Sequence, residues 1–296
     1  MYKLVKLKKR LFNRLTDGIF RTPPLRCDPA SPFVVLSQSY HADLTMFLVA
    51  AKSFARYLRP RHFVVVDDGL TSADRQMMSA HLGDVRFVRT ADVDVGSCPR
   101  RGTWERLTTI ASVCREHYVV QLDSDTVTRA HPDEVQRCIE ANLSFTLGTS
   151  QGQHFVAAEE ASRFAAQHAG THVQLVAERA LKDSPDAASA RYVRGCSGFA
   201  GFARGSIDFG ALQRASAQMQ QLVGVDKWRE WGSEQFTSNL LIANTPAAEV
   251  LPVSSYMNWT PGRDADGAKF LHFIGDHRFK GWRYIGEARR VIAASH

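Results

Sequence analysis

The sequence lacks most features of a disulfide-linked, membrane-spanning or secreted protein. Its five cysteines are odd in number, scattered and never spaced as C-x-x-C, so they predict neither a disulfide framework nor a zinc site. There is no apolar run of about 18 residues, the length that a transmembrane helix needs. The N-terminus lacks the unbroken apolar stretch and small-residue cleavage site of a secretory signal. We therefore expect a cytoplasmic protein with reduced thiols.

The positive charge is concentrated in one segment. Lysine and arginine total 37 against 30 aspartates and glutamates, a net charge of +7. Residues 1–26 hold eight basic residues and one acidic residue, so residues 27–296 sum to zero. A basic composition often indicates nucleic-acid binding, but here the excess belongs to a terminal segment. We therefore expect no nucleic acid among the partners.

The N-terminal segment predicts a basic amphipathic helix. Residues 3–20 read KLVKLKKRLFNRLTDGIF, with leucines at helical spacing among basic residues. Such a helix suits an anionic membrane surface at the inner face of a membrane. Packing of the helix on the protein's own domain fits the pattern equally well. Proline-containing stretches follow, so we divide the chain into an N-terminal segment, residues 1–26, and a domain, residues 27–296.

The domain alternates apolar strands with amphipathic helices. Strands separated by helices of this length form a mostly parallel sheet with right-handed crossovers, and its ligands bind at the carboxyl ends of the strands. The sequence therefore predicts a single large α/β domain, with a Rossmann-like sheet flanked by helices. The expected strands cover residues 33–37, 62–66, 85–88, 118–122 and 143–147. The expected helices cover residues 44–58, 71–82 and 104–116, the second with Thr71 as its N-cap.

Two acidic residues follow the strand at 118–122, in the stretch Asp123-Ser124-Asp125. Two carboxylates this close repel each other unless a cation lies between them. Oxygen ligands favour Mg²⁺ or Mn²⁺, and such an ion usually also binds phosphate oxygens of the substrate. It can then stabilise a phosphate leaving group. A solvated turn is the alternative, but the position at a strand end favours a metal site formed by Asp123 and Asp125.

With this motif in this position, the sequence resembles the GT-A glycosyltransferases and narrows towards glycosyltransferase family 8, the retaining galactosyl- and glucosyltransferases. The resemblance covers residues 33–284. It implies that Asp123 and Asp125 hold a metal ion bound to the diphosphate of a sugar nucleotide. It also implies that Arg106, on the helix before that strand, lies at the nucleotide pocket. Tyr40, just after the first strand, corresponds to the loop that holds the base.

Two later stretches match further motifs of that family. Cys196-Ser197-Gly198 matches an N-[SA]-G segment except at Cys196, which leaves the donor sugar open, and implies that Ser197 and Gly198 contact the donor. Glu234-Gln235 matches a D-Q pair, with a longer side chain at Glu234. The resemblance implies that Glu234 or Gln235 lies beside the anomeric carbon of the donor sugar. The alternative is that Glu234 only stabilises the first turn of its helix, where an acidic side chain interacts favourably with the helix dipole.

The last matching stretch supplies the third metal ligand. His272-Phe273-Ile274-Gly275 matches H-F-x-G, and Lys280, followed by glycine in place of proline, matches the family's K-P-W. The resemblance implies that His272 is a metal ligand, that Gly275 contacts the donor and that Lys280 contacts the donor diphosphate. An imidazole with two carboxylates suits Mn²⁺. A structural histidine after a strand is the alternative.

These residues predict a metal-dependent glycosyltransferase with Mn²⁺, or Mg²⁺, as its cofactor. The resemblance implies a hexose donor in the form of a nucleotide diphosphate sugar, a UDP-sugar, and transfer with retention. The acceptor is a saccharide or a lipid-linked molecule, and the basic helix favours a precursor of cell-envelope polysaccharide at a membrane surface.

Three other classes remain open. Residues 122–127 also match the D-x-D motif of the haloacid dehalogenase-like phosphatases. In that class the motif normally lies on the first strand, and the site needs a second acidic pair from a later strand. A nucleotidyltransferase expects a glycine-rich loop after the first strand, and residues 37–41 hold no glycine. A non-catalytic nucleotide-sugar-binding protein would keep the fold and bind nucleotide without turnover.

Overall fold

The computed structural model describes residues 2–296, and it describes the side chains of residues 7–275 and 277–296. The α-helices are α1 Tyr2–Leu15, α2 Leu44–Ala55, α3 Ser72–Leu82, α4 Trp104–Val113, α5 Asp133–Glu140, α6 Ala158–Ala166, α7 Val173–Ala180, α8 Phe209–Val223, α9 Val225–Trp228, α10 Ser233–Ala243 and α11 Arg283–Ala294. The 3₁₀ helices are η1 Asp17–Arg21, η2 His41–Asp43, η3 Thr90–Asp92, η4 Leu181–Asp183 and η5 Gly275–Phe279. The strands are β1 Phe33–Ser39, β2 Phe63–Asp67, β3 Val85–Arg89, β4 Tyr118–Leu122, β5 Thr126–Thr128, β6 Phe145–Leu147, β7 Val156–Ala157, β8 Arg191–Tyr192, β9 Cys196–Phe202, β10 Glu249–Leu251, β11 Tyr256–Asn258 and β12 Phe270–His272.

The main sheet has seven strands in the order β10-β6-β9-β4-β1-β2-β3. The pairs β1–β2, β2–β3 and β6–β10 are parallel, whereas β6–β9 is antiparallel. All residues of β2 and β4 are buried, as expected for continuous apolar runs that are covered on both faces. The predicted α/β class with a mostly parallel sheet is therefore confirmed.

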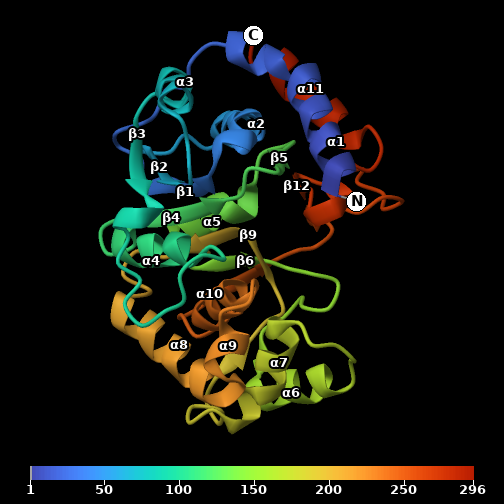
Figure 1. The fold of residues 1–296 in the computed structure, drawn as a ribbon. Coiled ribbons are helices and arrows are strands. Elements are labelled where there is room, and N and C mark those ends of the chain that lie inside the picture. Colours follow the sequence, from blue (N-terminus) through green and yellow to red (C-terminus); the bar gives the residue numbers. More distant parts are fainter. Residues whose placement is uncertain (1) are drawn as a thin grey trace. The chain divides into compact units, whose positions relative to one another are not determined.

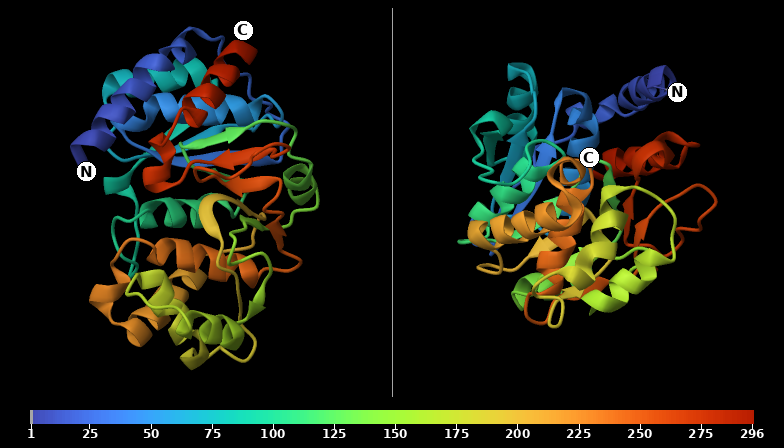
Figure 2. Two further views of the ribbon diagram at one scale, coloured as in Figure 1. Left: turned by 90° about the vertical axis from the view of Figure 1, so that its right-hand side faces the viewer. Right: turned by 60° about the horizontal axis from the view of Figure 1, so that its bottom comes forward.

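The chain forms two compact units. The first contains Met1–Arg89, Leu122–Gln136 and Ser254–His296, and the second contains Thr90–Gln121 and Arg137–Val253. In the first unit, β1, β2 and β3 form a parallel layer on which α2 and α3 lie (Figure 1). Its second sheet has the order β11-β12-β5, and Figure 2 shows the green β5 beside the red strands.

The second unit combines the strands β6, β9 and β10 with a group of helices. α6 packs on α7, and α7 and α10 pack on α8. A close approach inside this unit requires glycine at position 201, because a Cβ atom there would lie 2.3 Å from the Phe145 ring and 2.4 Å from the Tyr118 hydroxyl. Gly201 thus lets the aromatic side chains of neighbouring strands fill the space over β9.

The N-terminal segment forms the predicted helix, α1, although the side chains of residues 3–6 lie outside the described part. Phe12 of α1 is fully buried and stacks on Tyr284 of α11, with ring centroids 4.4 Å apart. Tyr284 in turn stacks on Phe273 at 4.3 Å. Figure 1 shows α1 and α11 side by side. One face of the helix therefore packs on its own unit. Among the described residues, no helix has both the length and the apolar character needed to cross a membrane.

Candidate functional site

The predicted metal ligands converge because of one strand pairing in the first unit. β4 ends at Leu122, and the chain turns through Asp123 and Asp125 into β5. β5 pairs antiparallel with β12, and this register places His272 opposite Thr126. The Phe273 amide also donates to the Asp125 carbonyl at 2.9 Å. The pairing therefore brings a histidine from the end of the chain next to the acidic turn.

The three side chains form a compact set of ligand atoms. One atom from each of Asp123, Asp125 and His272 can be chosen so that all lie within 4.8 Å of one another. The His272 Nε2 atom lies 3.3 Å from Asp125 Oδ1, and both side chains are buried. Two carboxylates and one imidazole are ligands that suit a divalent cation such as Mn²⁺.

His272 is held with one nitrogen facing the carboxylates. Its Nδ1 atom lies 2.9 Å from the carbonyl oxygen Oδ1 of Asn258, which is paired with it in register between β11 and β12. A carbonyl oxygen can only accept a hydrogen bond, so Nδ1 carries a proton and Nε2 is the nitrogen turned to the carboxylates. The Asp125 oxygen that faces Nε2 also only accepts, so either a proton or a metal ion can lie between the two. With the Nε2 proton displaced, these residues fit a metal ion.

Arg278 is a member of this cluster that sequence reasoning missed. Its guanidinium pairs with Asp125 Oδ2, and both groups are largely buried. Burial alone would raise the pKa of Asp125, but Arg278 and, after it, His272 hold that pKa well below its usual range. Asp125 is therefore a carboxylate, the state that a metal ligand needs. Only the folded arrangement of η5 relative to β5 identifies Arg278, because the matched motif singles out Lys280 instead.

The other predicted donor residues of this stretch lie at the surface. Lys280 is exposed, and its Nζ atom lies 3.5 Å from Nδ1 of His277. Gly275 begins η5 with a φ of +49°, a left-handed conformation that favours glycine, and a Cβ atom there would meet open space. The side chain that the structure places against Asp125 is therefore Arg278 and not Lys280.

Tyr40, predicted to face the nucleotide base, carries a cation over its ring. It follows β1 and is 43% exposed. Lys9 of α1 donates to its hydroxyl at 2.7 Å, and the Lys9 Nζ atom lies 4.5 Å from the ring centroid. The same ammonium pairs with Asp43 Oδ1 at 2.5 Å. Burial raises the pKa of Asp43 despite the opposing effect of Lys9. Lys9 therefore belongs to this polar group and not to the solvent face of α1.

A second cluster of predicted residues forms inside the second unit. Arg106 of α4 donates through Nη2 to both carboxylate oxygens of Glu234, each at 3.2 Å, and both residues are buried. The Thr103 hydroxyl donates to Glu234 Oε2 at 2.8 Å. Ser197 of β9 accepts from Arg106 at 3.3 Å and donates to Glu234 at 3.3 Å. The positive and negative charges therefore cancel within one buried network.

Gln235 and Gly198 border that network. The Ser197 amide donates to Gln235 Oε1 at 3.2 Å, whereas Gln235 Nε2 donates to Gln174 Oε1 at 2.9 Å. These two bonds fix which end of the Gln235 amide is the acceptor. Gly198 is buried within β9. The structure thus brings together Arg106, Ser197 and the pair Glu234-Gln235, three parts of the chain that lie far apart in the sequence.

The start of α10 gives a further local detail of this cluster. Gly232 is its N-cap, with a φ of +110°, and Ser233 is the first helical residue. The Ser233 hydroxyl accepts from Trp104 Nε1 at 2.9 Å and donates to the Glu230 carbonyl at 3.1 Å. These bonds connect the first turn of α10, which carries Glu234, to the start of α4.

Comparisons by sequence find no relative: no protein-family model matches the chain, and no curated protein matches it. Solved structures match the fold. The galactosyltransferase LgtC, in complex with donor and acceptor sugar analogues, has a TM-score of 0.50 at 13% identity over 88% of this chain and 95% of LgtC. The bifunctional glycosyltransferase WbbM, in its apo form, has a TM-score of 0.52 at 15% identity over 91% of this chain and 51% of WbbM.

At these identities the likeness is one of fold. The chain has the α/β architecture of these two proteins, and the predicted GT-A fold is confirmed. That fold does not favour the phosphatase alternative, because the acidic turn follows β4, after three earlier strands, where a phosphatase needs it on the first strand.

The first test concerns the metal ligands. Asp125→Asn removes one carboxylate, and Mn²⁺ affinity should fall by more than the roughly 10–100-fold that loss of an outer partner costs. Asn258→Ala removes only the partner of His272 Nδ1, so its loss should stay within about 10–100-fold. Titration of Mn²⁺ followed by electron paramagnetic resonance measures both. Asp266→Asn, on an exposed loop, is the matched control and should bind as the unaltered protein does. Unchanged binding by Asp125→Asn would contradict the assignment.

The second test concerns the buried ion pair. Glu234→Leu leaves the Arg106 guanidinium buried without its carboxylate and should lower the free energy of unfolding by about 3–5 kcal/mol. Adding Arg106→Met removes the stranded charge, so the double variant should recover much of that loss. Urea unfolding of both single variants and the double variant gives the coupling energy. Additive losses would show that the two residues do not stabilise each other.

Proposed function

We propose that this protein is a metal-dependent glycosyltransferase that moves a hexose from a nucleotide diphosphate sugar to an acceptor hydroxyl. The observation that carries the proposal is the cluster of Asp123, Asp125 and the Nε2 atom of His272 at the end of β4. A fold shared with two glycosyltransferases supports it. By the family resemblance we further propose Mn²⁺ as the ion and a UDP-sugar as the donor.

The residues of this cluster would act on the diphosphate. A bound dication supplies Lewis-acid stabilisation of the departing phosphate. Asp123, Asp125 and His272 would hold the ion, and Asp125 is already a carboxylate, the state that such an ion needs. Arg278 already carries positive charge beside Asp125, and Lys280 offers an exposed ammonium on the same segment. Both cations suit a ligand that develops negative charge.

The second cluster would act on the sugar. We assign Glu234 and Gln235 to the anomeric region and Ser197 and Gly198 to contacts with the donor. The Gln235 amide has a fixed orientation, because its two ends are bound to different partners. Such preorganisation lets its carbonyl dipole stabilise positive charge at the anomeric carbon without reorganisation. Arg106 holds the Glu234 carboxylate in place.

The reaction we propose proceeds with retention of configuration. The bond from the anomeric carbon to the diphosphate oxygen breaks, and a bond to the acceptor oxygen forms on the same face. The acceptor hydroxyl gives its proton to the leaving phosphate, so no side chain has to act as a strong base. Gly275 and Tyr40 complete the proposed donor contacts, with Lys9 over one face of the Tyr40 ring.

We also propose that α1 contacts an anionic membrane. Leu7 is 62% exposed, and Leu11 and Trp282, which are also exposed, line a cavity of about 220 Å³. Residues 2–16 contain several basic residues and no acidic one. Exposed apolar side chains flanked by basic ones suit insertion into a headgroup region with negative charge. A cytoplasmic protein attached in this way would meet a lipid-linked acceptor, such as a precursor of cell-envelope polysaccharide.

The third test measures turnover. With UDP-glucose and UDP-galactose as donors, Mn²⁺ should support release of UDP, and chelation by EDTA should abolish it. Asp123→Asn should lower the rate by more than about 100-fold, since losses outside the ligand set alone cost about 10–100-fold. Asp266→Asn is the matched control. Mn²⁺-dependent binding of UDP without any turnover would favour the non-catalytic alternative, and phosphate release from p-nitrophenyl phosphate would favour the phosphatase.

The fourth test measures membrane contact. Leu7→Ser with Leu11→Ser should weaken binding to phosphatidylglycerol-containing vesicles by about tenfold, because two apolar side chains no longer leave water. Arg10→Glu with Arg14→Glu should weaken it by about 30-fold or more, because each lost basic residue contributes about 1 kcal/mol. Arg59→Glu with Arg86→Glu, exposed elsewhere on the same unit, is the charge-matched control. Vesicle flotation measures all three variants, and equal binding to pure phosphatidylcholine vesicles would contradict the proposal.

A further inference from the structure

The second unit contains a cavity that the proposed metal cluster does not use. It has a volume of about 200 Å³ and lies beside α6 and α7. Side chains of three kinds line it: amides from the segment before β7, an aromatic ring from α6, and a buried ion pair. We call it the α6 cavity, and the lining residues that matter here are Gln151, Gln153, His154, Phe164, Glu178 and Arg194.

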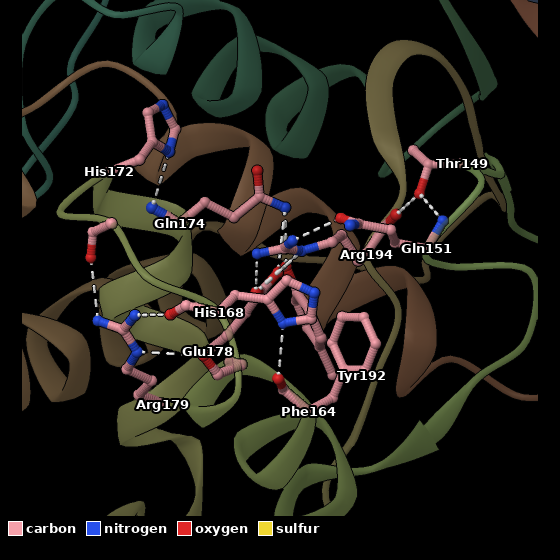
Figure 3. Close-up of polar contacts among 12 residues, drawn as sticks. Thr149, Gln151, Phe164, His168, His172, Gln174, Glu178, Arg179, Tyr192 and Arg194 are labelled. Atoms are coloured by element: carbon pink, nitrogen blue, oxygen red, sulfur yellow. Dashed lines mark hydrogen bonds and ion pairs between the residues drawn. The ribbon is translucent and has the colours of Figure 1, made fainter.

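The ion pair of the α6 cavity is neutral overall and rigid. The Arg194 Nε atom donates to both oxygens of Glu178, each at 3.0 Å, and the Tyr192 hydroxyl donates to Oε1 at 2.9 Å. Glu178 is buried, and Figure 3 shows these donors converging on it. The Glu178 carboxylate cancels the Arg194 guanidinium, and the lining also includes the carboxylate of Glu160, so the cavity has no excess positive charge to hold a phosphate.

A tight turn at residues 149–152 holds the Gln151 side chain, which lines the cavity, next to Arg194. The backbone of Thr149 and that of Gly152 exchange hydrogen bonds of 2.9 and 3.1 Å. A Cβ atom at Gly152 would lie 2.3 Å from the Arg194 carbonyl oxygen, so this approach requires glycine. The Gln151 Oε1 atom accepts from Arg194 Nη1 at 2.7 Å, as Figure 3 shows. The polar edge of the cavity is therefore preformed.

The lining of the cavity also offers an aromatic surface. Phe164 is 37% exposed, and the ring of His168 lies against it with centroids 4.4 Å apart. Within the described chain, the side chains of Gln153, His154 and Glu160 make no hydrogen bond, so their polar atoms are available to a ligand. A ring with one apolar face and several hydroxyl groups matches this combination of surfaces.

Hydrogen bonds connect the α6 cavity to a residue of the proposed sugar site. Gln174 Nε2 donates to Glu178 Oε1 at 3.3 Å, and Gln174 Oε1 accepts from Gln235 Nε2 at 2.9 Å. Gln174 thus joins the ion pair of the cavity to the amide that we assign to the anomeric region. The cavity and Gln235 belong to the same unit and to one polar network.

We propose that the α6 cavity binds a neutral saccharide, which is the acceptor class of this enzyme. The identification as acceptor rests on the proposed function, whereas the binding of a saccharide rests on the cavity alone. Phe164 stacks on the apolar face of the sugar ring, and Gln151, Gln153 and His154 bond its hydroxyl groups. The fixed pair of Glu178 and Arg194 supplies polar atoms without attracting an ion.

Saccharide binding is tested without donor or metal. The probes are methyl β-galactoside, methyl β-glucoside and methyl β-N-acetylglucosaminide, titrated and followed by saturation-transfer NMR. At least one should bind, and Phe164→Ala should weaken it by about tenfold through loss of the stacked ring. Gln153→Ala, at an exposed position that the fold does not need, should also weaken it. Arg163→Ala, exposed on the same helix but outside the cavity, is the matched control.

The outcomes separate this proposal from the proposed function. No binding by any probe, or binding unchanged in both Phe164→Ala and Gln153→Ala, overturns the saccharide site. Acidic or phosphorylated glycosides that bind more tightly than the neutral ones also overturn it. If a bound glycoside also receives sugar from a UDP-sugar, it is an acceptor. Saccharide binding that depends on Phe164, in a protein that shows no Mn²⁺-dependent UDP release, retains the site and rejects the transferase.

Discussion

Two carboxylates at the end of one buried strand impose the central constraint on this molecule. Asp125 cannot remain charged in the interior without positive charge close to it. The fold supplies that charge from a distant segment, through Arg278, and adds an imidazole whose outer nitrogen is held by Asn258. The β5–β12 pairing, the loop at η5 and the position of β11 are all needed for this arrangement. The result is a set of three side chains whose ligand atoms lie within 4.8 Å of one another, close enough to bind one cation.

In the second unit, buried carboxylates are neutralised by arginine side chains and need no metal ion. There the negative charge of Glu234 is cancelled by Arg106, 128 positions away in the sequence, and that of Glu178 by Arg194, 16 positions away. These pairs need nothing from outside, and Gln174 and Gln235 join them into one polar network. A network with no free charge is suited to recognising uncharged groups and to holding them in a fixed orientation. The two units thus differ in the kind of ligand their polar interiors suit.

Local patterns predicted the elements and the acidic turn, but not the long-range partners. Continuous apolar runs identified β1, β2 and β4, and Thr71 was recognisable as the N-cap of α3, where it forms a capping box with Asp74. Lys9 was grouped with the other basic residues of its helix, because a single sequence cannot show that one of them turns inward to Asp43. Arg278 and Asn258 escaped notice for the same reason. Their roles follow from strand register and loop geometry, which arise only when distant segments meet.

The ring stack that begins at Phe12 bears on how the chain can be shortened. Its middle member, Tyr284, donates a hydrogen bond to the Ser124 carbonyl at 3.3 Å, in the turn between the two acidic residues. Deleting the first helix to obtain a shorter protein for crystallisation would expose one face of the Tyr284 ring to solvent. It would thereby weaken the packing that positions the Tyr284 hydroxyl against that turn. A trimmed preparation would therefore be a poor stand-in for the intact molecule, even though the removed residues carry none of the metal ligands.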